Sequence, residues 1–366
     1  MRVCLEATSL RGRRSGVGYT AAELARSLVE CDPSLELTLF ALSAKRDDAL
    51  RTAADMPKTK LRGGNPVVRA ASWLWWRTDL LPAELLCGPA DVFHGPNYLL
   101  PPLHSAAGVV SIYDVSFDRV PELCSAGVKR VGDVAPLAMR RAHRIITSSA
   151  FTASEIAHFH PDAAERVRVV PVGVRDTFFT PQPAPPAARP YVAFLGNLEL
   201  RKGVDVLLDA FETVHRDLPE AGLLLVGQPG FGWDALAAKH ARLLATGATT
   251  IGYADDPTAA SILAGARALV YPSRYEGFGM PPLEAMACGT RVIVSNAASL
   301  PEVCGPHATY VDAGNAEALA AAITEAFATD ADPSALAAAR EHARTFTWRR
   351  TAAATIAVYK EAMDVA

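Results

Sequence analysis

The chain has 366 residues, half of them hydrophobic, and a formal net charge of −3. At about 100–200 residues per domain this length predicts two domains. A charged fraction of 20% argues against disorder, and the slightly negative charge argues against a nucleic-acid partner. Residues 1–180 hold 22 Lys and Arg against 19 Asp and Glu. This mildly basic half is compatible with an anionic or membrane-surface ligand, although ordinary surface variation explains it more simply.

Cysteine usage and hydropathy predict a cytoplasmic protein. The six cysteines form no Cys-x-x-Cys pair, a pattern that favours reduced, buried thiols over disulfides or a zinc site. The N-terminus reaches Glu6 after a single Arg, unlike a signal peptide, and no apolar run approaches the ~20 residues of a membrane helix.

Short apolar runs alternate with amphipathic ones in the first half, which predicts a parallel sheet covered by helices. Strands are predicted at Arg2–Glu6, Leu35–Ala41, Asp91–His94, Val109–Tyr113, Arg144–Thr147 and Val167–Val170, and helices at Tyr19–Glu30, Val128–Ala142 and Phe151–Phe159.

A proline-rich segment, 181–190, interrupts this alternation and predicts a linker, because proline disfavours both helix and ladder pairing. The alternation then restarts. Strands are predicted at Tyr191–Leu195, Leu223–Val226, Ala268–Tyr271 and Arg291–Val294, and helices at Val204–His215, Trp233–Leu244, Thr258–Ala266 and Pro282–Cys288. We therefore expect Rossmann-like domains at 1–180 and 191–345, with a C-terminal helix at 346–366.

Two strand-to-helix loops have the composition of anion sites. Gly16 and Gly18 precede the first helix, where they would let a backbone approach an anion at the helix N-terminus; a plain tight turn explains them equally well. In the second half, Asn197, Arg201 and Lys202 follow an apolar strand. Adjacent cations at the carboxyl end of a parallel sheet suit a phosphate ligand, against the alternative of a solvated basic loop.

Two carboxylates, Glu276 and Glu284, flank a glycine- and proline-rich turn after the Ala268–Tyr271 strand. Pro281 and Pro282 predict a helix start, so loop and helix N–H groups should converge on one point that suits an anion. The carboxylates would accept hydrogen bonds from sugar hydroxyls. The structural alternatives are a surface charge for Glu276 and helix-dipole complementation for Glu284.

Loops of the first half add polar candidates. His94 and Asn97 follow one predicted strand, and Tyr113 and Asp114 follow another. Because parallel strands end at the same edge of a sheet, these residues should face the same ligand; ordinary turn residues are an equally weighted alternative.

At these residues the sequence resembles the retaining glycosyltransferases of family 4, which have the GT-B fold of two Rossmann-like domains with a cleft between them and a C-terminal helix that crosses back. The resemblance is carried by YVAFLGNLELRKGVDVLLDAF, LLLVG, IGYADD, ALVYPSRYEGFGMPPLEAMACGTRVIVS and SLPEVCG. In the first half SGVGYTAAEL, DVFHGPNY, VVSIYDVSF, AHRIITSSAFTASEI and VRVVPVGV are similar to a branch that includes many mannosyltransferases.

The resemblance implies transfer of a hexose from a nucleoside-diphosphate sugar, GDP-mannose or a UDP-sugar, to a glycan, glycolipid or natural product, without an essential metal or other cofactor. Arg201 and Lys202 would neutralise the diphosphate, with Gly16 and Gly18 approaching it from the other domain. Glu284 would bind the ribose, and Glu276 would bind the sugar together with backbone groups of the segment Gly277, Phe278, Gly279 and Met280.

Two departures from the family pattern concern fine sugar contacts. Many members carry His where Tyr113 stands, and many carry Arg where Asn197 stands. A tyrosine keeps a hydrogen bond but, with an ordinary pKa near 10, not an acid–base role near neutrality.

Alternatives remain for the acceptor and for the activity. Ser72–Arg77 reads SWLWWR, which suits either a peripheral contact with the inner membrane face or, more simply, buried packing. Two alternatives for the activity are another GT-B enzyme, such as a sugar-nucleotide epimerase, and a catalytically weak binding subunit. Both would have the same donor site.

Overall fold

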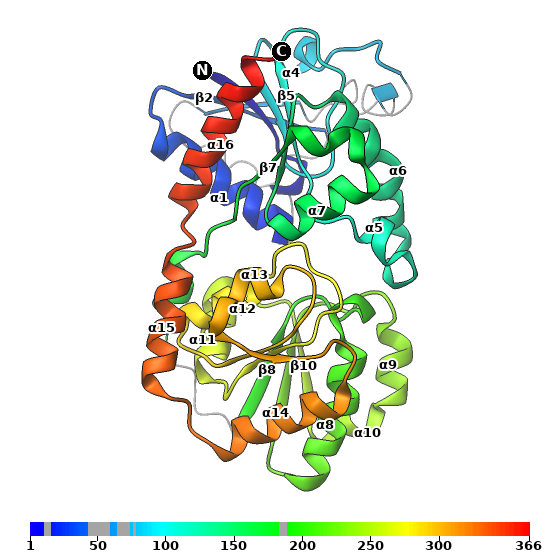
Figure 1. Ribbon diagram of the computed structural model, residues 1–366, viewed down its shortest axis with the longest axis vertical. Helices are drawn as coiled ribbons and strands as arrows, with labels where there is room; N and C mark the ends of the chain where they lie inside the picture. The colour runs from blue at the N-terminus through cyan, green and yellow to red at the C-terminus, as the bar shows by residue number, and fades with distance from the viewer. Residues whose placement is uncertain (11–15, 43–58, 64–73, 76–77, 183–188) are drawn as a thin grey trace. The chain divides into compact units, whose positions relative to one another are not determined.

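The computed structural model describes residues 1–10, 16–42, 59–63, 74–75, 78–182 and 189–366. The chain divides into two compact units, coloured along the sequence in Figure 1. Unit 1 comprises Met1–Asp118, Val128–Gly173 and Thr347–Ala366, and unit 2 comprises Arg119–Gly127 and Val174–Phe346. The chain thus enters unit 2 at Val174, ahead of the proline-rich segment 181–190, and returns to unit 1 at Thr347.

Unit 1 contains a parallel sheet in the order β3-β2-β1-β4-β5-β6-β7. The central strands β4 and β5 are buried along their whole length, as expected for parallel strands covered on both faces. The strands are β1 (Arg2–Glu6), β2 (Glu36–Ala41), β3 (Thr59–Gly63), β4 (Val92–Gly95), β5 (Ala107–Ser111), β6 (Arg144–Thr147) and β7 (Val167–Val169).

The helices of unit 1 include the C-terminal helix α16 (Trp348–Met363), which packs against α1 (Gly16–Cys31) and also contacts β4, β5 and β6. This arrangement confirms the predicted return of the C-terminal helix to the first Rossmann-like half. The other helices are α4 (Glu84–Cys87), α5 (Ser116–Arg119), α6 (Ala126–Arg141) and α7 (Ala150–Phe159). Among the residues described, no helix has the length and apolar character needed to cross a bilayer.

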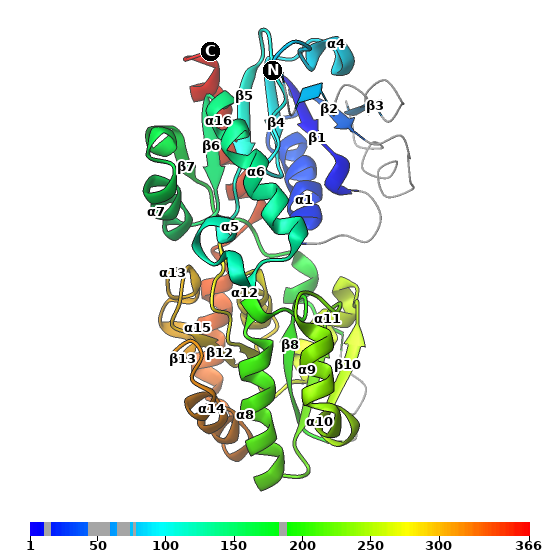
Figure 2. The ribbon, with the colours of Figure 1, turned by 90° about the vertical axis from the view of Figure 1, so that its right-hand side faces the viewer.

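Unit 2 contains a second parallel sheet, in the order β10-β9-β8-β11-β12-β13. Its strands are β8 (Tyr191–Leu195), β9 (Gly222–Val226), β10 (Ala248–Gly252), β11 (Leu269–Tyr271), β12 (Val292–Ser295) and β13 (Thr309–Val311). The helices are α8 (Val204–Asp217), α9 (Trp233–Lys239), α10 (Ala241–Thr246), α11 (Asp256–Gly265), α12 (Met280–Ala287), α13 (Leu300–Cys304), α14 (Ala316–Ala328) and α15 (Pro333–Arg344). Figure 2 shows α8, α9 and α10 together beside β8 and β10.

Both sheets reverse their strand order at one place, between β1 and β4 in unit 1 and between β8 and β11 in unit 2. Open α/β sheets bind ligands at the carboxyl ends of the strands beside such a reversal. In unit 2 this edge carries the loops after Leu195 and after Tyr271, which contain the predicted cations and Glu276.

Candidate active site

The loop after β8 is held against the loop after β11 by a glycine. Gly203 ends the 3₁₀ turn Leu200–Lys202 and begins α8 with φ 71°. A Cβ added to it would lie 2.0 Å from the carbonyl oxygen of Pro272. Only glycine therefore allows both this backbone conformation and this close approach.

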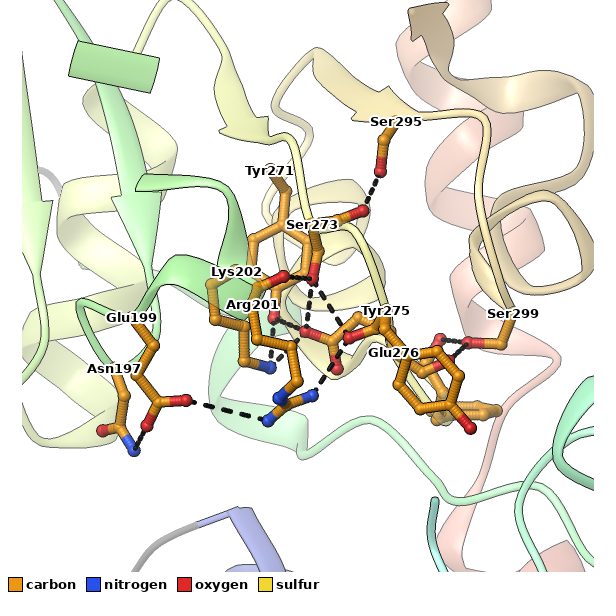
Figure 3. Close-up of polar contacts among 11 residues, drawn as sticks. Asn197, Glu199, Arg201, Lys202, Tyr271, Ser273, Tyr275, Glu276, Ser295 and Ser299 are labelled. Atoms are coloured by element: carbon orange, nitrogen blue, oxygen red, sulfur yellow. Dashed lines mark hydrogen bonds and ion pairs between the residues drawn. The ribbon is translucent and has the colours of Figure 1, made fainter. Parts of the chain in front are cut away.

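Lys202 consequently lies beside the end of β11. Its Nζ donates to the hydroxyl of Tyr271 at 3.0 Å and to the carboxylate of Glu276 (Figure 3). The same carboxylate oxygen, Oε1, accepts from the Tyr271 hydroxyl at 2.6 Å and from Ser273 Oγ at 3.2 Å. Of the three protons on Nζ, two are engaged in these bonds.

Glu276 is held as a carboxylate despite its burial. Burial is the largest influence and raises its pKa, but Lys202, Arg201 and the Tyr271 hydrogen bond together bring the pKa below its ordinary value. All side-chain hydrogen bonds that the described residues make to Glu276 end on Oε1. Its other oxygen can therefore accept a bond from a ligand hydroxyl.

Arg201 is matched with a second carboxylate. One guanidinium nitrogen donates to the carbonyl oxygen of Tyr275 at 3.0 Å, and the other lies 3.9 Å from Glu199 Oε2. Asn197 donates to the other oxygen of Glu199 at 3.3 Å. Arg201 thus lies near the Glu199 carboxylate, and Lys202 near the Glu276 carboxylate. A bound anion would replace part of this negative charge beside the two cations.

Further side chains fix the loop after β11. Ser299 Oγ lies 2.8 Å from the carbonyl oxygen of Glu276 and 2.9 Å from that of Phe278. Arg274 forms a two-point ion pair with Asp205 at 2.6 and 2.7 Å. These contacts hold the cluster in a single geometry before any ligand binds.

Glu284 belongs to a different ion-pair group. Its Oε1 accepts from Arg175 at 2.6 Å, and Arg175 Nε lies 3.0 Å from Asp256 Oδ2. Burial, together with Asp256, raises the pKa of Glu284 in spite of Arg175. A ribose bound to Glu284 would have to share it with Arg175, a partner that no sequence pattern predicted.

The start of α12 offers fewer donors than we expected. Pro281 and Pro282 occupy its first turn and have no N–H, so Met280 and Leu283 are left as the possible backbone donors there. Gly279, at φ 97°, begins the helix, and the Phe278 ring packs on Phe346 at 5.9 Å between centroids. Gly277 is buried in the same loop. These residues can contribute through their backbone, as predicted, more readily than through side chains.

In unit 1 the predicted residues lie at the carboxyl ends of the strands beside the reversal of strand order; in both units this part of the sheet is called the switch-point edge. Gly16 and Gly18 form the first turn of α1, where Thr20 Oγ1 donates to the Gly16 carbonyl at 3.0 Å. Asn97 is exposed. Asp114 accepts from the Ser116 N–H at 2.9 Å.

His94 lies inside β4 and is fully buried. Its Nδ1 is 2.8 Å from the Tyr359 hydroxyl on α16, and its Nε2 is 2.9 Å from Ser111 Oγ. Burial lowers its pKa to about 3. A direct ligand contact from this ring would require one of these two bonds to be given up.

Two further residues were not among the predicted site residues: Tyr98, which ends the predicted loop that carries His94 and Asn97, and Glu6. Tyr98 adopts φ 57°, its hydroxyl accepts from the Asp114 N–H at 2.9 Å, and its ring meets that of Tyr113 edge-on. Glu6 ends β1 beside the strand of His94, and burial raises its pKa to about 7. The available signal was a single acid directly after the apolar run Val3–Leu5.

The two sheets with this switch-point geometry match solved glycosyltransferase structures. Sucrose-phosphate synthase from Thermosynechococcus elongatus superposes with a TM-score of 0.75 at 18% identity over 100% of both chains. WaaG, a glycosyltransferase of lipopolysaccharide biosynthesis, superposes with 0.67 at 14% identity over 100% of this chain and 99% of its own. The fold is therefore GT-B.

The sequence comparisons place the chain in a family. Residues 176–345 match the model for glycosyl transferases group 1. O-antigen chain mannosyltransferase B of Escherichia coli is 31% identical over 282 residues, 74% of each chain. MMP alpha-(1->4)-mannosyltransferase of Mycolicibacterium hassiacum is 32% identical over 231 residues, 61% of this chain and 55% of that protein. The protein belongs to the glycosyl transferases of group 1, in the family 4 type with mannosyltransferase relatives.

Proposed function

We propose that unit 2 binds a nucleoside-diphosphate hexose, GDP-mannose or a UDP-sugar, and that the enzyme transfers the hexose with retention of anomeric configuration. The observation that carries the proposal is the convergence of Arg201, Lys202 and Glu276 at the switch-point edge of the sheet. In support, the similarly folded Anabaena protein HepE was solved with UDP and glucose (TM-score 0.71, 17% identity, 98% of this chain and 99% of that one). The mannosyltransferase relatives favour mannose.

The cations would act on the leaving diphosphate. Lys202 has one ammonium proton beyond those bonded to Glu276 and Tyr271, and that proton can reach a phosphate oxygen without breaking the cluster. Arg201 would contribute its planar guanidinium. As the glycosidic bond breaks, the diphosphate gains charge, and fixed cations stabilise that charge without reorganising. We propose no metal or other cofactor at this site, because these two side chains supply the positive charge.

Glu276 would orient the sugar. Its second carboxylate oxygen would accept a hydroxyl of the hexose, while the backbone of 277–280 contacts the same ring. For retention, the acceptor hydroxyl attacks on the face from which the diphosphate departs, and a leaving phosphate oxygen takes the acceptor proton. No nucleophile of the enzyme is then required.

A glycan, glycolipid or natural product would serve as acceptor. We place the reaction in the cytoplasm, with contact at the inner membrane face only if the acceptor is lipid-linked. Of the SWLWWR segment, Trp75 is 1% exposed and donates to the Leu81 carbonyl at 2.6 Å, which supports packing at that position. Residues 72, 73, 76 and 77 lie outside the described part of the chain.

The test combines binding with turnover. We expect one nucleoside diphosphate from a panel to raise the melting temperature, since selective binding to the folded state stabilises it. Incubation with the matching sugar nucleotide and a range of acceptors should then release that diphosphate, with or without EDTA, and NMR of the product should show the donor's anomeric configuration.

Other outcomes identify the alternatives. Conversion of the donor to a different sugar nucleotide or free sugar without an acceptor would indicate an epimerase-like enzyme. Binding with no turnover of any donor would indicate a binding subunit. An inverted product would overturn the retaining mechanism while leaving the donor site intact.

A further inference from the structure

A second polar cluster in unit 2 lies on the helices α8, α9 and α10, apart from the residues assigned to the donor. Asp209 and Glu212 are one turn apart on α8, and His240 stands at the junction of α9 and α10. One possible ligand atom from each of the three lies within 4.8 Å of the other two. The carboxylates are 42% and 49% exposed, whereas the His240 side chain is completely buried.

Glu212 orients the imidazole. Its Oε1 lies 2.9 Å from His240 Nδ1. In metal sites a carboxylate on one ring nitrogen fixes the proton there and leaves the lone pair of the other nitrogen for the ion. This contact therefore favours the tautomer in which His240 Nε2 is an acceptor.

The opposite nitrogen faces a carboxylate without a hydrogen bond. His240 Nε2 is buried and has no hydrogen-bond partner within the described residues, and it lies 3.3 Å from Asp209 Oδ1. Two acceptor atoms at this separation would repel each other. Ligands bonded to one tetrahedral zinc ion at about 2.0–2.1 Å lie about 3.3 Å apart, so the spacing fits a shared cation.

Of this pair, Asp209 is the member that solvent reaches, since its side chain is 42% exposed. Asp209 also lines a groove of about 630 Å³ between α8 and α14. Lys239 Nζ lies 2.5 Å from the same Asp209 oxygen, but its side chain is 57% exposed. An exposed ion pair contributes little, so a divalent ion can displace this lysine.

We propose that Asp209 Oδ1 and His240 Nε2 bind one divalent transition-metal ion of the zinc type, with Glu212 holding the imidazole and water completing the coordination. The ion would link α8 to the α9–α10 junction and stabilise unit 2. It takes no part in the donor chemistry proposed above, so the two proposals stand or fall separately.

The test is a titration of EDTA-treated, dialysed protein with zinc chloride, followed by calorimetry and by melting temperature. We expect one saturable site and an upward shift of the melting temperature. D209N and H240Q should each weaken zinc binding by at least tenfold, and E212Q by about tenfold, the usual loss for an outer carboxylate. K239A should strengthen binding, because it removes the competing ammonium.

H158Q removes an exposed histidine of α7 and should leave zinc binding unchanged. If H240Q fails to fold, D209N and K239A still decide the question, since they move the affinity in opposite directions. Absence of saturable binding, or binding indifferent to D209N and K239A, would overturn the proposal.

Discussion

The two switch-point edges deal with buried ionisable groups in opposite ways. In unit 2, Glu276 stays ionised because cations and hydroxyls surround it, which lowers its pKa. In unit 1, burial alone acts on His94 and dominates on Glu6, moving each pKa toward the neutral form, to about 3 and about 7. The edge of unit 2, where cations neutralise a carboxylate, can accept a phosphate in place of that carboxylate. The edge of unit 1, where burial keeps ionisable groups neutral, suits neutral hydroxyl groups.

The largest expected effect is the acid sensitivity that His94 confers. Its pKa is about 3 in the folded chain and near 6.5 when unfolded. The unfolded chain therefore binds one more proton across this window, and stability falls as pH drops from 6.5 toward 3, in total by about 5 kcal/mol. Urea unfolding of H94Q and wild type at several pH values should show this slope in wild type and its loss in the variant. Equal slopes would contradict the buried neutral imidazole.

Next in size is the contribution of Lys202 to diphosphate binding. K202A should weaken nucleoside-diphosphate affinity by about 100-fold, or ~3 kcal/mol, as expected for losing a preorganised charged donor. The measurement is calorimetric titration. R216A provides the control, since Arg216 is 70% exposed and pairs only with neighbouring Asp217 among the described residues. Unchanged affinity in K202A would remove Lys202 from the donor site.

The contribution of Glu6 to the pH dependence of stability should oppose that of His94. The folded pKa of Glu6, about 7, exceeds the ordinary value of 4.5, so the folded chain binds the extra proton and stability falls as pH rises from 4.5 to 7. The total is on the order of 3 kcal/mol. E6Q removes this opposing contribution, so its stability should rise more steeply with pH than that of wild type. A shallower slope in E6Q would contradict the assignment.

Removing the Tyr359 hydroxyl should have a smaller effect. Y359F leaves His94 Nδ1 buried without its partner, at a cost of about 1–3 kcal/mol. Thermal unfolding measures the loss, and Y310F, which removes a hydroxyl bonded to the Gly305 carbonyl in unit 2, is the comparison. Diphosphate affinity should be unchanged in Y359F.

The smallest effect concerns Glu199. Its distance of 3.9 Å from Arg201 makes a weak ion pair, worth under about 1 kcal/mol. E199Q should therefore raise diphosphate affinity by a few-fold, because Glu199 would no longer offset part of the positive charge of Arg201. A loss of affinity would show that Glu199 itself contacts the ligand.

How far the fold could be predicted depended on where a strand lies in its sheet. Strands with both faces covered, such as β8 and β9, are continuous apolar runs, and the sequence predicts them. The missed strands β3, β10 and β13 are all at sheet edges. Their residues are mostly partly or fully exposed, so hydrophobic periodicity is weak there and partner strands supply the ordering. The edge strand β7 was predicted because two valines flank Arg168 in an alternating pattern.

Some residues of the candidate site could likewise be predicted from the sequence, and others could not. Arg201, Lys202 and Glu276 were predictable because each lies in a glycine-marked loop after an apolar strand. Tyr271, at the end of β11, and Ser273, in the loop after it, were not predictable, since nothing in the local sequence marks them as hydrogen-bond partners of a carboxylate. The pairing of Arg175 with Glu284 joins residues 109 apart in the chain, and no sequence pattern encodes it.

By itself the sequence determined the alternation of strands and helices, the strand-to-helix loops that carry charge and the family to which the chain belongs, because these depend on neighbours along the chain. Which charges compensate one another, and which groups burial keeps neutral, followed instead from the packing of segments far apart along the chain. His94 and Tyr359 are 265 residues apart and meet only because α16 returns to unit 1. Electrostatic energies depend on distance and burial in space, and neither is written in local sequence.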